Sequence, residues 1–363
     1  MPPTPSPPPH TWTPQRPPPG HAPGCTPELD AWLAQGAEPP VDADEPIVDP
    51  HHHLWDANAW RGRYRLGDLW ADTGTGMGRG HRIVKTVFVE CRSGYREDGP
   101  EHLRPVGETA FVAAMARASR EGGGGPLIAG IVAHADLRLD SKLDHLLDAH
   151  EAAGDGLFRG IRQGGASEPA YEALYIPGRA DPGLYADAGF RAGLARLGGR
   201  GLSFDAWHYH HQNAAFTDLA RAVPGTTLVL DHLGTPLGVG PYAGQRDAIF
   251  DAWRHDMDAL ALCPNVCIKL GGLAMPDNGY GWHRQPRPPD SQAVLAAHGR
   301  WWRHALDCFG AARCMAESNF PVDRLSLPYG TYWNAMQRFC ADLPATDRRA
   351  LLHDTAARVY RLD

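Results

Sequence analysis

The stretch PIVDPHHHLWD, from Pro46 to Asp56, places three consecutive histidines at the end of a short apolar run. Its Ile-Val pair is β-branched, which is typical of a buried strand. Side chains alternate along a strand, so His51 and His53 point to one face while His52 points to the other. Any single one of the 19 histidines is most simply a hydrogen-bonded structural residue. Two on one face can bind one metal ion or one substrate, and α/β proteins place their ligand sites at the carboxyl ends of strands.

Seven further apolar runs have the character of strands, and most follow the previous one after about 30 to 45 residues, the length of a strand-loop-helix-loop unit. They cover residues 82–91, 126–137, 157–163, 201–210, 226–232, 265–272 and 313–319. Apolar residues recur at helical spacing over 107–120 and over 245–263. Eight strands that alternate with helices predict a (β/α)8 TIM barrel, with parallel strands inside and helices outside.

A doubly wound open sheet is the alternative architecture. It normally carries a glycine-rich phosphate-binding turn after its first strand. Here that turn reads HHHLWDANAW and contains no glycine, while the GGGG of residues 122–125 precedes a predicted strand and reads as a flexible connector. The barrel therefore remains the predicted fold, as a single domain over residues 25–363.

Composition narrows the classes of function. The first 24 residues, Met1 to Gly24, are rich in proline and lack the apolar core of a signal peptide, so they are predicted to be a disordered, dispensable tail. No stretch reaches the roughly 18 to 20 apolar residues of a membrane span. The net charge of −7 argues against a nucleic-acid partner. Seven scattered cysteines without a C-x-x-C motif fit reduced thiols in the cytoplasm. Whether the chain forms a homo-oligomer stays open.

Nearly every predicted strand ends in a titratable or polar side chain. Because a barrel of this kind builds its active site from the carboxyl ends of its strands, these residues are the candidate site. In chain order they are His51 and His53, Glu90 and Arg92, His134, Arg162, His208 and His210, Asp231 and His232, Lys269, and Glu317 and Asn319.

Five strand-end motifs, in barrel order, resemble those of a known family. They are IVDPHHHLWD, FDAWHYHHQ, LVLDHLGTPLG, IKLGGLAM and ESNFPVDR, and the resemblance extends from about residue 30 to the end of the chain. The sequence is similar to the amidohydrolase superfamily, within it to the lactonase-like "amidohydrolase 2" branch that includes fuconolactonase and pyrone-dicarboxylate lactonase. One H-x-H alone is a weak indication, whereas five motifs in order are specific.

The resemblance implies roles for the histidines. His51 and His53 match the first-strand H-x-H, which binds a divalent ion in metal-dependent members and lines the substrate pocket in metal-free members. His210 best matches the fifth-strand histidine, with His208 as its competitor. His232 matches the sixth-strand histidine, which would polarise the scissile carbonyl or donate a proton. Three imidazoles suit zinc and leave a position open for water. A mechanism without metal stays open beside this one.

The last strand departs from the family pattern. The resemblance would place a water-activating Asp where this chain has Asn319. An amide cannot act as a general base and is a poorer zinc ligand. Glu317 shares the parity of Asn319, so it either replaces the missing carboxylate or forms an ion pair with Lys269. Glu90 is a further candidate base.

Arginines and aromatic residues predict the substrate side of the site. Arg162 and Arg92 follow two strands, and forked guanidinium donors suit a substrate with a carbonyl or carboxylate group. Lys269 is a further candidate contact. Tyr280 and Trp282 lie in the long loop GYGWHRQPRPP of residues 279–289. The structural alternatives are that Arg162 belongs to a core ion pair and that Trp282 only packs the loop.

Together these patterns predict a hydrolase of a small cyclic ester, a lactone, through water activated by zinc or by a carboxylate, with His232 and Arg162 stabilising the oxyanion. A non-hydrolytic enzyme of the same fold, such as a decarboxylase, lyase or cyclase, is the first alternative, and Asn319 keeps it open. A catalytically inactive, ligand-binding barrel is the second. Burying so many unused ionisable groups would be costly, which argues against it.

Overall fold

The computed structural model describes residues 26–56, 62–74 and 80–362. The predicted tail from Met1 to Gly24 lies outside these residues, so its disorder stays a prediction. Among the described residues, none of the helices combines the length and the apolar character needed to cross a bilayer. The six cysteines in this part of the chain are free thiols.

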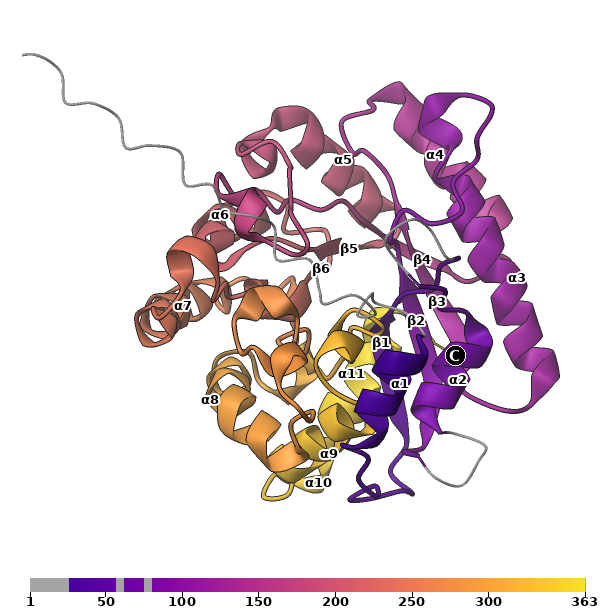
Figure 1. Cartoon of the computed structure of the whole chain (residues 1–363). Helices are drawn as coiled ribbons and strands as arrows, with labels where there is room; N and C mark the ends of the chain where they lie inside the picture. The colour runs from indigo at the N-terminus through magenta and orange to yellow at the C-terminus, as the bar shows by residue number, and fades with distance from the viewer. Residues whose placement is uncertain (1–25, 57–61, 75–79, 363) are drawn as a thin grey trace, which may run out of the picture.

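Eight parallel strands form one sheet in the order in which they occur along the chain, which confirms the predicted barrel (Figure 1). Each of the eight apolar runs contains one strand. The strands are β1 (Ile47–His52), β2 (Ile83–Val89), β3 (Leu127–His134), β4 (Phe158–Arg162), β5 (Ser203–Ala206), β6 (Leu228–Leu230), β7 (Val266–Lys269) and β8 (Cys314–Met315).

Most of the helices surround the strands on the outside of the barrel, whereas Ala356 and Val359 of the last helix pack against the interior side chains (Figure 1). The helices are α1 (Pro27–Ala34), α2 (Leu66–Thr73), α3 (Val106–Gly122), α4 (Ser141–Ala153), α5 (Ala188–Gly199), α6 (Asn213–Ala222), α7 (Arg246–Leu260), α8 (Ser291–Phe309), α9 (Tyr329–Phe339), α10 (Ala345–Arg349) and α11 (Thr355–Val359). The helical spacings noted over 107–120 and 245–263 correspond to α3 and α7. The buried residues of α7 are Ile249, Trp253, Met257 and Leu260, the face that its 3.6-residue period predicts.

The barrel closes between its last and first strands through the residues that follow β8. His52 and Phe320 form a parallel bridge. The backbone N–H of His53 donates to the Phe320 carbonyl at 2.7 Å, and that of Asn319 donates to the His51 carbonyl at 3.0 Å. The closure therefore brings the ESN segment directly beside the histidine-rich end of β1.

The interior of the barrel is filled by short apolar side chains from its strands. They form one buried cluster with the C-terminal segment, and its members include Val48, Val87, Val89, Val132, Val229, Cys267, Met315 and Tyr360. Packing at this level leaves no open pore, as is usual for an eight-stranded barrel. A second, larger core lies between the strands and the helices.

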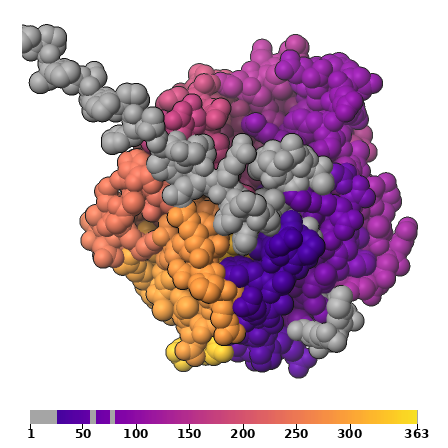
Figure 2. Space-filling model, in the orientation of Figure 1, coloured from indigo at the N-terminus to yellow at the C-terminus, as the bar shows by residue number. Residues whose placement is uncertain are grey.

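The segment that contains α1 packs against the loop between β7 and α8. In the space-filling view the indigo N-terminal residues lie beside the orange surface of the later half-barrel (Figure 2). The indole of Trp32 donates to the Gln285 carbonyl at 2.9 Å. Trp32 also belongs to a small buried cluster with Leu29, Leu33 and Leu325. This contact holds part of the long 279–289 loop against α1.

Candidate functional site

A layer of charged side chains lies on top of the apolar interior. At the carboxyl ends of β6, β7 and β8 a charged residue stands two positions after an interior one, and it shares the interior face because side chains alternate along a strand. Asp231 follows Val229, Lys269 follows Cys267, and Glu317 follows Met315. All of these charged side chains are fully buried.

Glu317 lies between two imidazoles. Its Oε1 accepts from His232 Nδ1 at 2.7 Å, and its Oε2 lies 2.8 Å from His51 Nδ1. The backbone N–H of His232 also donates to Oε1 at 3.1 Å. Burial would raise the pKa of Glu317, but His232 and His51 hold it well below its usual range. The carboxylate is therefore ionised and orients both rings.

The position of His232 depends on its own backbone and on a facing glycine. His232 has a left-handed φ of 55°. Gly272, in the IKLGG motif after β7, also has a positive φ, and a Cβ there would lie 2.1 Å from His232 Nδ1. Only glycine leaves this space free. With Nδ1 bound to Glu317, the remaining ring nitrogen, Nε2, is left for chemistry. Burial lowers the pKa of His232, but the facing Glu317 raises it above the ordinary value overall.

Lys269 lies beneath Glu317 and His232, at the centre of the charged layer. Its ammonium is 2.7 Å from Asp205 Oδ2, 3.0 Å from Asp231 Oδ1 and 3.1 Å from His51 Nδ1. Burial would lower the pKa of Lys269, but Asp205 and Asp231 raise it. The hydroxyl of Tyr360 donates to Asp205 Oδ2 at 2.6 Å. Lys269 therefore pairs with these two aspartates, whereas the direct partners of Glu317 are the two histidines.

Arg162 links the layer to the cavity above it. Its Nε donates to Glu90 Oε1 at 2.9 Å, and its guanidinium also donates to the Glu90 carbonyl. Nη1 lies 3.4 Å from His51 Nε2 and 3.5 Å from Asp231 Oδ2. Burial raises the pKa of Glu90, but Arg162 lowers it below its usual range overall. Arg162 is thus a core ion-pair member, the structural alternative noted from the sequence, while it also lines the cavity.

The buried layer holds four carboxylates against two cations. Arg162 and Lys269 pair with Glu90, Asp205 and Asp231, whereas Glu317 faces His51 and His232, and Glu90 also lies 4.0 Å from His134. With these imidazoles neutral, the layer has an excess of two negative charges. Buried charge without compensation is costly, so protons or a divalent cation must balance it. Burial raises the pKa of Asp205 even beside Lys269, and protonation there would remove part of the excess.

One group in this layer can hold a metal ion. Single ligand atoms of His51, His232 and Glu317 all lie within 4.8 Å of one another among the described residues. Two imidazoles and a carboxylate are a donor set that zinc uses. The group shares His51 with the set implied by the sequence but contains His232 and Glu317 in place of His53 and His210. The Nδ1 atom of His53 instead lies 2.8 Å from the Val89 carbonyl.

A cavity of about 730 Å³ opens above the charged layer. Aromatic walls and several of the predicted residues surround it, whereas His51, Glu317 and Lys269 lie below its floor. The polar residues that line it include His53, Glu90, Arg92, His134, Arg162, His232 and Asn319. Seven residues from the ends of six strands therefore meet at one opening.

Asn319 faces this cavity in an unusual backbone conformation. Its φ is 56°, in the left-handed region that asparagine tolerates better than most residues. The amide Nδ2 donates to Asp323 Oδ1 at 2.9 Å. Burial raises the pKa of Asp323 to about 7, although His232 and the hydrogen bonds from Ala274 and Asn319 act to lower it. The strand thus presents an amide to the cavity, with a carboxyl group behind it.

Three predicted site residues lie elsewhere in the structure. His210 contacts the ring of Tyr242 at 5.0 Å, and its Nδ1 accepts from the Leu237 N–H at 3.3 Å. Tyr280 and Trp282 stack on each other with ring centroids 4.8 Å apart. None of the three is among the residues that line the 730 Å³ cavity. The packing alternative for Trp282 therefore describes its contacts.

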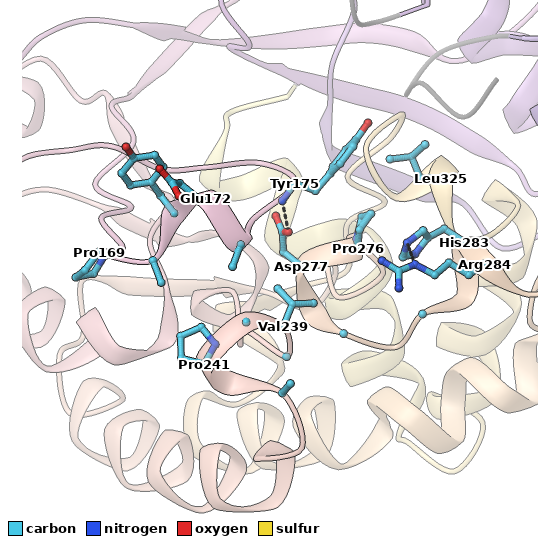
Figure 3. A pocket seen from close by; sticks show the side chains of 18 residues that line it. Pro169, Glu172, Tyr175, Val239, Pro241, Pro276, Asp277, His283, Arg284 and Leu325 are labelled. Carbon is cyan, nitrogen blue, oxygen red and sulfur yellow. Dashed lines mark hydrogen bonds between the residues drawn. The ribbon is translucent and has the colours of Figure 1, made fainter. Parts of the chain in front are cut away.

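A larger cavity, about 1070 Å³, lies next to the first. Figure 3 shows Asp277 pointing toward Tyr175, whose N–H donates to it at 2.6 Å. Tyr175 lines both cavities and so forms part of the wall between them. The walls of the larger cavity carry few ionisable groups, among them Glu172, Asp277 and Arg284, and none from the charged layer. The smaller cavity is therefore the candidate active site.

Sequence reasoning missed two buried members of the network. Asp205 stands inside the strand SFDA, and a charged residue between buried apolar neighbours was the available indication. Tyr360 lies in the C-terminal segment, far from any strand end, and nothing in its local sequence marks it. Both act on the site through Lys269, whose ammonium lies 5.5 Å from the Tyr360 ring centroid.

Comparison with known proteins identifies the family of the chain. A family model described as Amidohydrolase matches residues 48–362. The uncharacterized protein y4mH of Sinorhizobium fredii is 31% identical over 340 residues, which cover 88% of this chain and 100% of that protein. L-fucono-1,5-lactonase of Burkholderia ambifaria is 28% identical over 328 residues, which cover 87% and 96% of the two chains. The crystal structure of an amidohydrolase from Burkholderia multivorans with bound zinc superposes with a TM-score of 0.68, 25% identity and coverage of 87% and 99%.

Proposed function

Because this chain belongs to the Amidohydrolase family, we propose that it hydrolyses a small cyclic ester, a lactone. The observation that carries the proposal is the pairing of Glu317 with both His51 and His232 beneath an accessible cavity. The similarity to L-fucono-1,5-lactonase supports the choice of a lactone. The substrate is a small molecule, and the cavity of about 730 Å³ has the size of such sites.

His232 is the proton-transferring residue in this proposal. Nε2 of His232 takes a proton from water, and the water oxygen attacks the lactone carbonyl carbon, whose π electrons move to the carbonyl oxygen. When the ring C–O bond breaks, the imidazolium returns the proton to the leaving oxygen, and a hydroxy acid forms. Glu317 stabilises the imidazolium and fixes the tautomer, which is the role of a carboxylate behind a histidine base. Glu317 is therefore a positioning residue for His232 on this route.

Arginines serve the charged parts of the reaction. Arg162 lies at the cavity floor with its guanidinium fixed by Glu90 and Asp231, so its positive charge needs no rearrangement to stabilise the oxyanion. Arg92 lines the same cavity and is exposed, so it can bind a carboxylate or hydroxyl of the substrate. Lys269 is proposed to act from below, by holding His51 and the aspartates in place.

We further propose that zinc can bind in the charged layer. His51, His232 and Glu317 would hold it, and the two excess negative charges of the layer fit a divalent ion. When bound, zinc supplies Lewis-acid polarisation and a more acidic water. His232 would then be a ligand, and Glu90, which lines the cavity with Asp136 and Asp181, is the candidate carboxylate to accept a proton. In the structure the same three side chains bind one another directly, so the metal-independent route through His232 stands beside this one.

A non-hydrolytic reaction, such as decarboxylation, is the second candidate. Asn319 favours it, because an amide faces the cavity where the family pattern would place a water-activating carboxylate. If hydrolysis is the function, Asn319→Asp should raise lactone turnover or tighten zinc binding. If the reaction does not use activated water, the same substitution should leave lactone turnover at zero and lower the conversion of an aromatic acid.

The deciding experiment compares both reactions on one protein. Purified chain, once stripped by a chelator and once supplied with zinc, is incubated with a panel of sugar lactones and aromatic carboxylic acids. A pH-stat detects one acid released per lactone opened, and CO₂ evolution detects decarboxylation. The exposed Glu172→Gln in the neighbouring cavity serves as the matched control for Glu317→Gln. Lactone opening that depends on Glu317 supports the proposal, whereas CO₂ release with no lactone opened in either metal state would overturn it.

A further inference from the structure

A second convergence of metal-ligating side chains lies on the outer helical layer. Asp258 of α7 meets His304 and Cys308 of α8, and among the described residues this is the other group of three such side chains beside the barrel site. His304 and Cys308 are four residues apart, so they project from one face of the helix. Asp258 reaches them from the packed neighbour, which leaves a carboxylate, an imidazole and a thiol at one point.

The three ligand atoms form a nearly equilateral triangle. His304 Nε2 lies 3.1 Å from Asp258 Oδ1, Cys308 Sγ lies 3.2 Å from the same oxygen, and the sulfur lies 3.3 Å from the nitrogen. Zinc bonds of about 2.0 to 2.3 Å in a tetrahedron imply ligand separations of about 3.3 to 3.7 Å. The triangle therefore matches one face of a tetrahedral site after a widening of a few tenths of an ångström.

A nucleophilic triad does not explain the same atoms. In a Cys-His-Asp relay the thiol and the carboxylate bind opposite nitrogens of the imidazole. Here both approach Nε2, which also lies 3.2 Å from the Arg254 carbonyl. The oxygen, nitrogen and sulfur atoms converge on one point and do not form a linear relay. Metal ligands are arranged in this way around an ion.

The surroundings allow a cation to enter and to be retained. The Asp258 side chain is 58% exposed, whereas that of His304 is only 19% exposed. Asp307 adds a further negative charge that acts on Cys308. The nearby Arg254 guanidinium lies 3.8 Å from Asp251, so this pairing offsets part of its positive charge.

We propose that Asp258, His304 and Cys308 form a second zinc site, which clamps α7 to α8 and leaves one coordination position for water. Binding releases the thiol proton to solvent, so a thiolate, a neutral imidazole and a carboxylate together balance the two charges of the ion. All three ligands lie in the C-terminal halves of helices that run antiparallel to the strands, so the site is at the end of the barrel away from the catalytic cavity. Its role is to stabilise the helical layer and not to take part in turnover.

Cobalt(II) distinguishes this site from the barrel site, because only the outer group contains a thiol. The full chain is titrated anaerobically with cobalt(II), and the thiolate-to-cobalt charge-transfer band is recorded, followed by displacement with zinc. We expect one equivalent of the band per chain, its loss in Cys308→Ser, and its persistence in Glu317→Gln. Asp258→Asn should weaken cobalt binding by at least about tenfold, since even indirect changes around metal ligands cost that much.

Asp307→Asn is the matched control, because it removes the same charge from the residue directly before Cys308 without removing a ligand. It should change cobalt affinity by less than about threefold, the scale of an exposed charge interaction. If Cys308→Ser does not fold, His304→Gln takes its place in the test. The absence of the band in the wild-type chain, its survival in Cys308→Ser, or an equal loss in the two Asp variants would overturn the proposal.

Discussion

Replacing Glu317 by glutamine tests the candidate site most directly. The carboxylate oxygens lie 2.7 Å from His232 Nδ1 and 2.8 Å from His51 Nδ1, so each ring can donate to its own oxygen. The amide of glutamine has one oxygen and one NH₂ group, and it can accept from only one of the two rings. The other imidazole must change tautomer or lose its partner. On the proposed route, either event disturbs the proton transfer.

The expected losses of kcat and of folding free energy follow from the number of hydrogen-bond partners that glutamine can keep. A misplaced or wrongly tautomerised base typically costs about a hundredfold to ten-thousandfold in kcat, or roughly 3 to 5 kcal/mol in the barrier. One lost charge-assisted hydrogen bond in a buried site should cost about 1 to 3 kcal/mol of folding free energy. Because the layer has an excess of carboxylates, removing one negative charge offsets part of this loss, and we expect a stability loss near the lower value.

Steady-state turnover of a lactone substrate and urea denaturation measure the two effects separately. Glu172→Gln, an exposed carboxylate in the neighbouring cavity, should change neither. A Glu317→Gln variant that retains kcat within about threefold, well short of the smallest expected loss, would refute the role given to the Glu317–His232 pair. A variant that loses several kcal/mol of stability while its folded fraction keeps full turnover would show that the pair is only structural.

Three further outcomes are expected. Gly272→Ala should lower both the free energy of unfolding and kcat, because the new Cβ would lie 2.1 Å from His232 Nδ1; unchanged turnover with unchanged stability would contradict this. Tyr360→Phe should cost about 1 to 3 kcal/mol in urea denaturation by removing the 2.6 Å bond to Asp205, with kcat altered far less than by Glu317→Gln. The pKa of Glu317 is lower in the folded than in the unfolded state, so its contribution to stability is complete above the unfolded pKa of about 4.3 and is lost as pH falls. Denaturation curves between neutral pH and about pH 3 should therefore show a smaller loss of unfolding free energy in Glu317→Gln than in wild type.

The sequence alone determined the barrel and most of the strand-end residues. Strand alternation and helical spacing are local patterns, so the eight strands and the buried face of α7 could be predicted without knowledge of any distant contact. The same alternation placed His51 on one face with His53 and Glu317 on one face with Asn319, while Lys269 was a strand-end candidate. The family resemblance then identified His232, which no periodicity would have separated from the other histidines.

Only the tertiary structure decided which of these groups meet. Glu317 pairs with His51 and His232, although a Lys269 partner fitted its sequence position equally well. The choice depends on how the strands close between β8 and β1, where hydrogen bonds join residues more than 250 positions apart. Loop direction likewise turned His210 and Trp282 away from the cavity. Alternation along one strand fixes the face of a side chain, but its partner is set by the stagger between strands and by the packing of loops, which no local pattern encodes.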